Sequence, residues 1–236
     1  MIDAPGPVPL ATKRSQVFLV DDHPLVREGL AKVIEREPDL CICDFAESAG
    51  VAYERIARSR PDAVVVDLSL GGQSGLDLIK QLQLLPHPPP VLVLSMHDEL
   101  HYAERAIRAG ALGYVMKRET ASKIIDGIRR VIQRRTYFSE SVAFHLAENF
   151  TRGRAGQTAT AVGRLSDREL EIFRLIGLGL ENRRIADDLH LSLKTVQTHC
   201  AHIKEKLGLS GAAELMREAV RWVERENTGA GAGDPQ

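Results

Sequence analysis

The chain has 236 residues, 44% of them hydrophobic, which is enough for one large or two small domains with buried cores. Its formal net charge of −1 lacks the basic balance that is typical of nucleic-acid-binding proteins. The sequence contains no apolar run near the roughly 20 residues that cross a membrane, and its start lacks the layout of a signal peptide. We therefore expect a soluble cytoplasmic protein with no membrane partner.

Residues 1–14 are rich in proline and lack periodicity, which predicts a flexible arm. Over residues 15–137, short apolar runs alternate with segments of helical periodicity. The expected strands are 17–20, 40–46, 63–66, 91–94 and 113–116, and the expected helices are 24–36, 48–60, 75–85, 98–109 and 120–133. Continuous apolar strands that alternate with helices favour a five-stranded parallel sheet covered on both faces, so we predict a doubly wound α/β domain.

Cys41 and Cys43 lie two residues apart in a predicted strand, so their side chains share one face. An odd number of cysteines without regular spacing argues against a disulfide framework. The sequence offers no second His/Cys cluster to complete four metal ligands, so we expect both to pack as small hydrophobic side chains.

The remainder of the chain changes character. Residues 138–162, rich in Gly, Ala, Thr and Arg towards their end, predict a linker. Residues 163–228 predict an all-α domain of four helices, and residues 229–236 a flexible tail. Its first helix begins with a capping box at Ser166 and Glu169 and ends near Gly179. The other helices are expected at 182–189, 193–207 and about 212–226.

Polar residues follow several of the predicted strands. Asp21 and Asp22 follow the first strand, Asp67 the third, Ser95 the fourth and Lys117 the fifth. Each alone is more often a turn residue, a helix cap or a solvated side chain. In a doubly wound sheet, however, the carboxyl ends of the strands lie along one edge. Three carboxylates there favour Mg²⁺, and with a lysine they indicate phosphoryl transfer to Asp67 as the nucleophile.

Residues 16–133 resemble the receiver domain of two-component response regulators, which has a flavodoxin-like fold. The matching motifs are Asp21-Asp22, Asp67, Gly75, Ser95 and residues 113–117. The resemblance implies that Asp22 binds Mg²⁺ directly and Asp21 binds it through water, while Asp67 contributes a carboxylate oxygen and Ser69 its backbone carbonyl. It further implies that Ser95 and Lys117 stabilise the phosphoryl group and that Tyr114 is an aromatic switch that moves inwards. Gly71 departs from the proline common in receivers.

A helical wheel separates two faces of the predicted helix 193–207. Val196, Cys200, Ile203 and Leu207 form the core face, and Lys194, Gln197, Thr198 and Ala201 lie opposite. His202 and Lys204 flank this polar face and can reach phosphates, whereas Glu205 would repel them. Such a helix suits a DNA major groove, but the wheel alone fits a solvated surface helix in an unrelated bundle equally well.

Residues 165–225 resemble a LuxR-type helix-turn-helix, and with the receiver they define the NarL/FixJ class. The match rests on Leu165-Ser166, Arg168-Glu169, Gly179, Asn182, Ile185-Ala186, Leu189, Ser192, Lys194-Thr195-Val196, His199, Ile203 and Lys206-Leu207-Gly208. The resemblance makes 193–207 the recognition helix. The expected DNA-binding residues are Ser192, Lys194, Thr195, Gln197, Thr198, Ala201, His202 and Lys204. Gln197 stands where a basic residue is common, and glutamine favours adenine edges.

We predict a transcription regulator, not an enzyme, whose phosphorylation at Asp67 by a sensor histidine kinase controls binding to promoter DNA. The resemblance implies a homodimer through the last helix, and RNA polymerase is a further candidate partner. We expect the resting receiver to cover the recognition helix or its dimer face. The alternative is a DNA-binding regulator whose receiver is a phosphorylation-independent dimer platform. An aspartate-based phosphatase is disfavoured, because Ser69 stands where that class requires a second aspartate.

Overall fold

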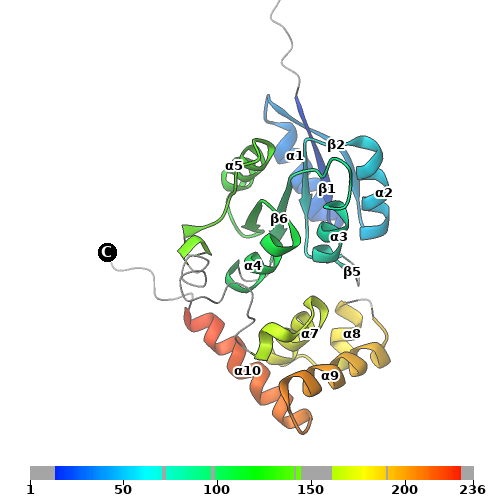
Figure 1. Ribbon diagram of the computed structural model, residues 1–236, viewed down its shortest axis with the longest axis vertical. Helices are drawn as coiled ribbons and strands as arrows, with labels where there is room; N and C mark the ends of the chain where they lie inside the picture. The colour runs from blue at the N-terminus through cyan, green and yellow to red at the C-terminus, as the bar shows by residue number, and fades with distance from the viewer. Residues whose placement is uncertain are drawn as a thin grey trace, which may run out of the picture.

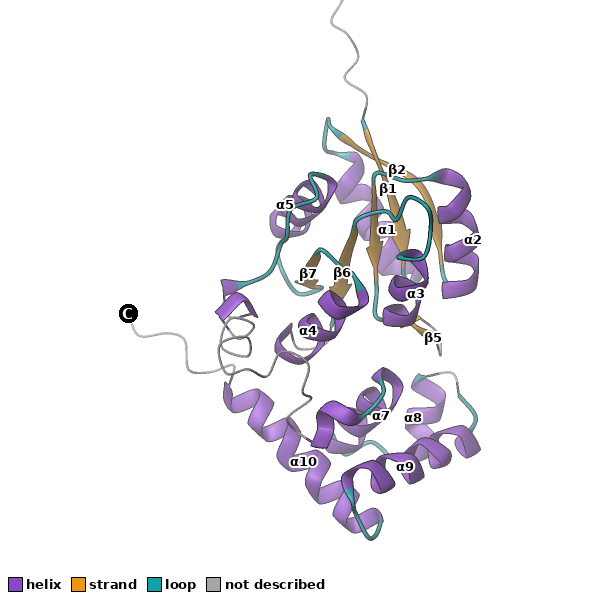
Figure 2. Ribbon diagram, in the orientation of Figure 1, coloured by secondary structure: helices purple, strands orange, loops and turns teal. Residues whose placement is uncertain are grey.

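The computed structural model describes residues 14–70, 73–96, 99–140, 142–144, 161–189 and 191–229. Almost all of the predicted arm, the middle of the predicted linker, Gly71 and most of the predicted tail lie outside the described residues. An N-terminal α/β half is followed by a helical half, as Figures 1 and 2 show.

The N-terminal half contains a five-stranded parallel sheet with the strand order β2-β1-β3-β6-β7. The strands are β1 Ser15–Val20, β2 Leu40–Ala46, β3 Ala63–Val66, β6 Val91–Ser95 and β7 Gly113–Met116. The helices are α1 Pro24–Glu35, α2 Ala49–Ser59, α3 Gly75–Leu82, α4 Glu99–Ala109 and α5 Ala121–Ile132. This is the order of a flavodoxin-like fold, which confirms the predicted doubly wound domain.

Two hydrophobic layers hold this sheet, because alternate strand residues face opposite sides. Val17 and Leu19 pack with α1 and α5, whereas Phe18 and Val20 pack with α2, α3 and α4. Cys41 and Cys43 lie half-buried in β2 as free thiols, and Cys43 packs against the core, as predicted. Among the described residues, no helix combines the length and apolar character needed to cross a membrane.

A small hairpin was not predicted. Strand β4, Ser69–Leu70, pairs antiparallel with β5, Gln73–Ser74, between Asp67 and the start of α3. In the sequence Gly71 and Gly72 separate the two strands, and a Gly-Gly pair between short strands is a hairpin signal.

The C-terminal half is a helical domain that begins with a 3-10 helix, Ala161–Arg164. The helices are α7 Asp167–Gly177, α8 Asn182–Asp188, α9 Leu193–Leu207 and α10 Ala212–Gly229. Ser166 and Glu169 form the predicted capping box of α7. α9 begins and ends where predicted, with Ser192 as N-cap and Gly208 as C-cap at φ 67°, while α10 is longer than predicted.

The apolar stripe of α10 packs mainly within this domain. Leu215, Ala219, Trp222 and Val223 are buried, and the rings of Phe173 on α7 and Trp222 lie 5.7 Å apart. Met216, on the other hand, is 43% exposed. Within the predicted linker, Val142 is buried, so that segment is partly packed where the structure describes it.

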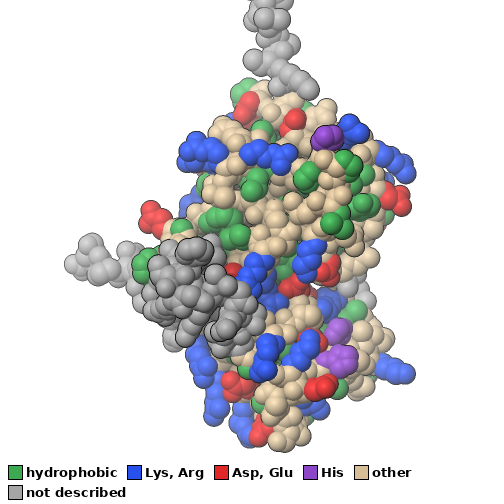
Figure 3. Space-filling view, viewed as in Figure 1, with side chains coloured by type: hydrophobic (Ala, Val, Ile, Leu, Met, Phe, Trp, Pro, Cys, Tyr) green, Lys and Arg blue, Asp and Glu red, His purple; other side chains and the backbone are tan. Residues whose placement is uncertain are grey.

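The receiver half contacts the helical half through α7. Arg105 of α4 donates hydrogen bonds to Asp167 Oδ1 at 2.8 Å and to the carbonyl of Leu165 at 2.9 Å. Lys80 of α3 lies 3.4 Å from Asp167 Oδ2, and Ser69 of β4 donates to Glu171 at 2.7 Å. Figure 3 shows blue and red side chains together where the two halves meet.

Candidate functional site

The predicted polar residues meet at the carboxyl edge of the sheet. Asp21 and Asp22 follow β1, and Asp67 follows β3, whose residue Val66 pairs with Val20. The amide of Asp67 donates to the carbonyl of Val20 at 2.8 Å. This bond fixes the start of the segment 67–74 between β3 and α3, which we name the acceptor loop. Ser95 ends the neighbouring β6. The amide of Lys117 donates to the Ser95 carbonyl at 2.8 Å, so the lysine is anchored beside it.

The carboxylates form a compact cluster. Asp21, Asp22, His23 and Asp67 each offer a ligand atom, and these atoms lie within 4.8 Å of one another. Lys117 Nζ lies 2.7 Å from Asp21 Oδ2 and 2.7 Å from Asp67 Oδ2. His23 was missed by the sequence analysis, although it directly follows Asp22, and its Nδ1 lies 2.8 Å from Asp22 Oδ1.

Burial controls the charge of the cluster. Asp67 is 5% exposed, and burial raises its pKa to about 6, while the Lys117 ammonium opposes this rise. Burial lowers the pKa of Lys117, but the adjacent Asp67 and Asp21 raise it by more, so the net shift is upwards. Both groups are therefore mainly charged at neutral pH, and Asp67 can act as a nucleophile.

This donor set fits a hard divalent cation. The three carboxylates and the Lys117 ammonium together carry two negative charges in excess, in a site that is largely shielded from water. Oxygen ligands with excess negative charge are what Mg²⁺ and Ca²⁺ select.

The polar face of α9 points to solvent. Lys194, Gln197, Thr198, Ala201 and His202 are exposed, whereas Thr195 and Lys204 are half-buried. Opposite them, Val196, Cys200 and Ile203 are buried as predicted, and Leu207 is half-buried. We expected the receiver to cover the recognition helix or its dimer face. The exposed outer face of α9 contradicts the first alternative for this structure, and the second stays a prediction.

At the start of α9 the hydroxyl groups are already engaged. The Ser192 side chain accepts from the Thr195 amide at 3.0 Å, and the two hydroxyl oxygens lie 2.7 Å apart. Thr198 Oγ1 donates to the Lys194 carbonyl at 3.0 Å. Leu193, which the sequence analysis left out of the polar face, is 43% exposed beside it.

Known proteins share both halves of this chain. Residues 17–129 match the family described as "Response regulator receiver domain", and residues 163–219 match "Bacterial regulatory proteins, luxR family". The oxygen regulatory protein NreC of Staphylococcus carnosus is 32% identical over 211 residues, which cover 87% of this chain and 97% of NreC. This chain belongs to the two-component response regulators of the NarL/FixJ class. As a response regulator, it controls transcription.

Solved structures support the fold of this response regulator. A LuxR-family response regulator from Aurantimonas sp. SI85-9A1 is 33% identical, with a TM-score of 0.55, over 59% of this chain and 99% of that one. RcsB from Salmonella enterica serovar Typhimurium, solved bound to promoter P1flhDC with a phosphomimetic, is 22% identical, with a TM-score of 0.57. The match covers 89% of this chain and 100% of RcsB, and at this identity it supports the fold alone.

A close backbone approach explains why this response regulator has glycine at position 75. A Cβ at position 75 would lie 2.1 Å from the carbonyl oxygen of Asp67, so a side chain cannot fit without moving the acceptor loop. The Gly75 amide donates to the Leu68 carbonyl at 2.8 Å, which holds the loop closed over the start of α3. Glycine is therefore required here by close backbone approach.

The two predicted switch residues of the response regulator lie inside the core. Ser95 is fully buried, and Tyr114 is 1% exposed in β7, one strand further along the sheet. The Tyr114 ring is thus already inside the core in this structure.

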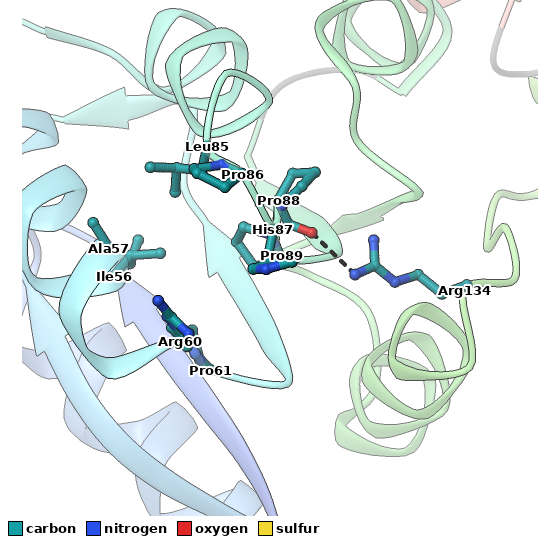
Figure 4. Close-up of a pocket in the computed structure, with 10 residues that line it drawn as sticks. All are labelled: Ile56, Ala57, Arg60, Pro61, Leu85, Pro86, His87, Pro88, Pro89 and Arg134. Atoms are coloured by element: carbon teal, nitrogen blue, oxygen red, sulfur yellow. Dashed lines mark hydrogen bonds between the residues drawn. The ribbon is translucent and has the colours of Figure 1, made fainter.

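A cavity lies at the end of the sheet opposite the carboxylate cluster (Figure 4). It has a volume of about 180 Å³ and is lined by the end of α2, the loop 85–89 and Arg134. Pro61 precedes β3 and Pro89 precedes β6, so the cavity borders the amino ends of these strands. Arg134 donates to the Pro88 carbonyl at 3.0 Å, and none of the described lining residues is acidic. The cavity is therefore separate from the carboxylate cluster.

Proposed function

We propose that a sensor histidine kinase phosphorylates Asp67 and that this reaction controls the binding of α9 to promoter DNA. The observation that carries the proposal is the buried carboxylate cluster, with Lys117 2.7 Å from Asp67, in a chain that also presents an exposed polar helix. In this reaction an Asp67 oxygen attacks the phosphorus atom, an acyl phosphate forms, and the bond to the donor atom breaks.

The other site residues assist this step. We assign Mg²⁺ to Asp21, Asp22, Asp67 and the backbone carbonyl of Ser69, where the bound ion neutralises charge on the phosphoryl oxygens. Lys117 pairs with one phosphoryl oxygen, and the Ser95 hydroxyl donates to another. Tyr114 pairs with Val93 on the strand that Ser95 ends, two residues from Ser95, so we propose that a change at Ser95 alters the packing of its ring. We propose no catalysis beyond the protein's own phosphorylation.

The proposed DNA interface is the outer face of α9. We assign base contacts to Gln197, Thr198 and Ala201, and backbone contacts to Lys194, His202 and Lys204. Ser192 and Thr195 fix the start of the helix, whose free amides suit a phosphate. A homodimer through the exposed part of α10, which includes Met216, would read two half-sites roughly 10 bp apart. RNA polymerase is the proposed downstream partner.

Control requires two arrangements of the two domains. We place the receiver at residues 15–137, the linker at 138–162 and the DNA-binding domain at 163–228. The docked arrangement is supported by the contacts of α7 with Arg105, Lys80 and Ser69. In our proposal phosphorylation weakens this docking, so that the DNA-binding domain can rearrange into a dimer.

The experiment compares DNA binding across genomic fragments with and without acetyl phosphate and Mg²⁺. The wild-type chain should bind a set of fragments more tightly with the phosphodonor, and Asp67→Asn should show no such response. Asp62→Asn, an exposed aspartate near the start of the same strand, is the matched control and should respond like the wild type. Equal binding by wild type and Asp67→Asn under both conditions would refute the proposal and favour a phosphorylation-independent dimer platform.

A further inference from the structure

One side chain connects the acceptor loop to the DNA-binding domain. Ser69 lies two residues after Asp67, and its hydroxyl donates a hydrogen bond of 2.7 Å to Oε1 of Glu171. Glu171 lies on α7, 102 residues further along the chain. The segment that carries the proposed nucleophile is thus bonded directly to the first helix of the other domain.

Glu171 is bonded in turn to the helix-turn-helix motif. Its Oε2 accepts from Arg168 Nη1 at 2.5 Å, and Arg168 Nη2 donates to the Leu189 carbonyl at 2.9 Å. Leu189 is the C-cap of α8, three residues before the N-cap of α9. These contacts form a continuous hydrogen-bond chain from Ser69 to the turn that precedes the recognition helix.

The chain of contacts is shielded from water. The Arg168 and Glu171 side chains are only 14% and 12% exposed. The receiver residues Leu68, Ser69 and Tyr102 and the α7 residues around Glu171 line a small, partly open space of about 10 Å³, which is at most the room for one water molecule. Hydrogen bonds to a charged group in such surroundings are among the stronger ones.

We propose that Glu171 is a positioning residue for the acceptor loop, and that its bond to Ser69 opposes phosphorylation of Asp67 while the domains are docked. The inference rests on the proposed function. If phosphorylation weakens docking, docking must disfavour phosphorylation by the same factor, because coupling between two equilibria is reciprocal. Ser69 takes part in both docking and phosphorylation, because its hydroxyl makes the docking contact and its backbone carbonyl is the proposed metal ligand.

The test measures the initial rate at which acetyl phosphate and Mg²⁺ label the full-length chain. If only the undocked form is labelled, the rate follows the undocked fraction, which the loss of one charge-assisted hydrogen bond should raise about tenfold. Ser69→Ala removes the bond and should show this rise. Glu171→Gln keeps an acceptor oxygen but loses the charge that strengthens the bond, so it should show a smaller rise, and the double variant should be no faster than Ser69→Ala.

Two matched controls remove similar groups elsewhere. Ser59→Ala deletes a hydroxyl bonded within α2, and Glu218→Gln deletes a carboxylate paired within α10. Both should label like the wild type. As a second measurement, hydrogen exchange at residues 165–172 should be faster in Ser69→Ala and Glu171→Gln, without Mg²⁺ or phosphodonor, and unchanged in the controls.

The outcomes separate the two proposals. A wild-type chain that is never labelled would overturn the proposed function and this inference together. A labelled wild type with an unchanged rate in folded Glu171→Gln would overturn the inference alone. The inference would also be overturned if Ser69→Ala raised the labelling rate by the same factor in the Glu171→Gln variant as in the wild type. Ser69 would then act within the receiver only.

Discussion

Replacing Arg105 with glutamine should release the DNA-binding domain from the receiver. Arg105 makes two hydrogen bonds across the junction, at 2.8 Å to Asp167 and at 2.9 Å to the Leu165 carbonyl. The Arg105 and Asp167 side chains are each 18% exposed, so water screens their ion pair only in part. Losing such charge-assisted bonds should cost docking about 2 kcal/mol. That free energy corresponds to about a 30-fold shift in the docking equilibrium.

Hydrogen exchange in the first turn of α7 measures this shift, and small-angle X-ray scattering reports the accompanying expansion. The control is Arg108→Gln, one turn further along α4, where the arginine pairs with Glu104 of the same helix. Arg105→Gln should exchange faster and scatter as a more extended particle, while Arg108→Gln should match the wild type. Equal behaviour of the two variants would refute the assignment of Asp167 and Arg105 to the docking contact.

Three further predictions address the acceptor loop, the helical core and the DNA interface. Gly75→Ala should lower the free energy of unfolding, measured with urea, by about 1–3 kcal/mol and abolish labelling by acetyl phosphate. The reason is that its Cβ would lie 2.1 Å from the Asp67 carbonyl oxygen. Gly50→Ala in α2 is the control, because no atom lies within 4 Å of a Cβ there, and it should leave stability and labelling unchanged. Equal losses in the two variants would contradict the close approach at Gly75. Burial raises the pKa of Glu169, but bonds from Lys206 and Ser166 lower it by more, so the pKa is lowered overall. A lowered pKa means that ionised Glu169 stabilises the folded state. This contribution to the free energy of unfolding is present above the ordinary glutamate pKa of about 4.3 and is lost as the pH falls through the lowered pKa. Glu169→Gln should therefore melt lower at pH 7 and approach the wild type in acid; a constant difference would contradict this. Gln197→Ala should relax preference at one base pair by roughly 1–3 kcal/mol, measured by binding to single-substitution duplexes, and an equal loss on all sequences would refute base contact.

Much of the fold and of the acidic site follows from local patterns. Short apolar runs predict the strands, and a parallel sheet brings their carboxyl ends to one edge whatever their distance in sequence. That rule is sufficient to predict that Asp21, Asp67 and Lys117 lie together. The bounds of α9 were equally predictable, since Ser192 and Gly208 satisfy opposite ends of a helix.

Some features have no local signal, and others have only a weak one. The Ser69–Glu171 bond joins residues 102 positions apart, and only the packing of two finished domains creates it. For the same reason the prediction that the receiver covers the recognition helix or its dimer face did not anticipate its contacts with Asp167 and Glu171 of α7. His23 was not predicted as a site residue because a histidine after a strand is usually solvated. The hairpin β4–β5 was not predicted because its strands have only two residues each.

The most direct measurement locates the phosphoryl group on the chain. The protein is labelled with acetyl phosphate and Mg²⁺, the acyl phosphate is trapped by borohydride reduction, and mass spectrometry identifies the reduced residue. The account predicts reduction at Asp67 and none in the absence of phosphodonor. A labelled chain with the modification at any other residue, or no modification in a folded protein with Mg²⁺ present, would contradict it.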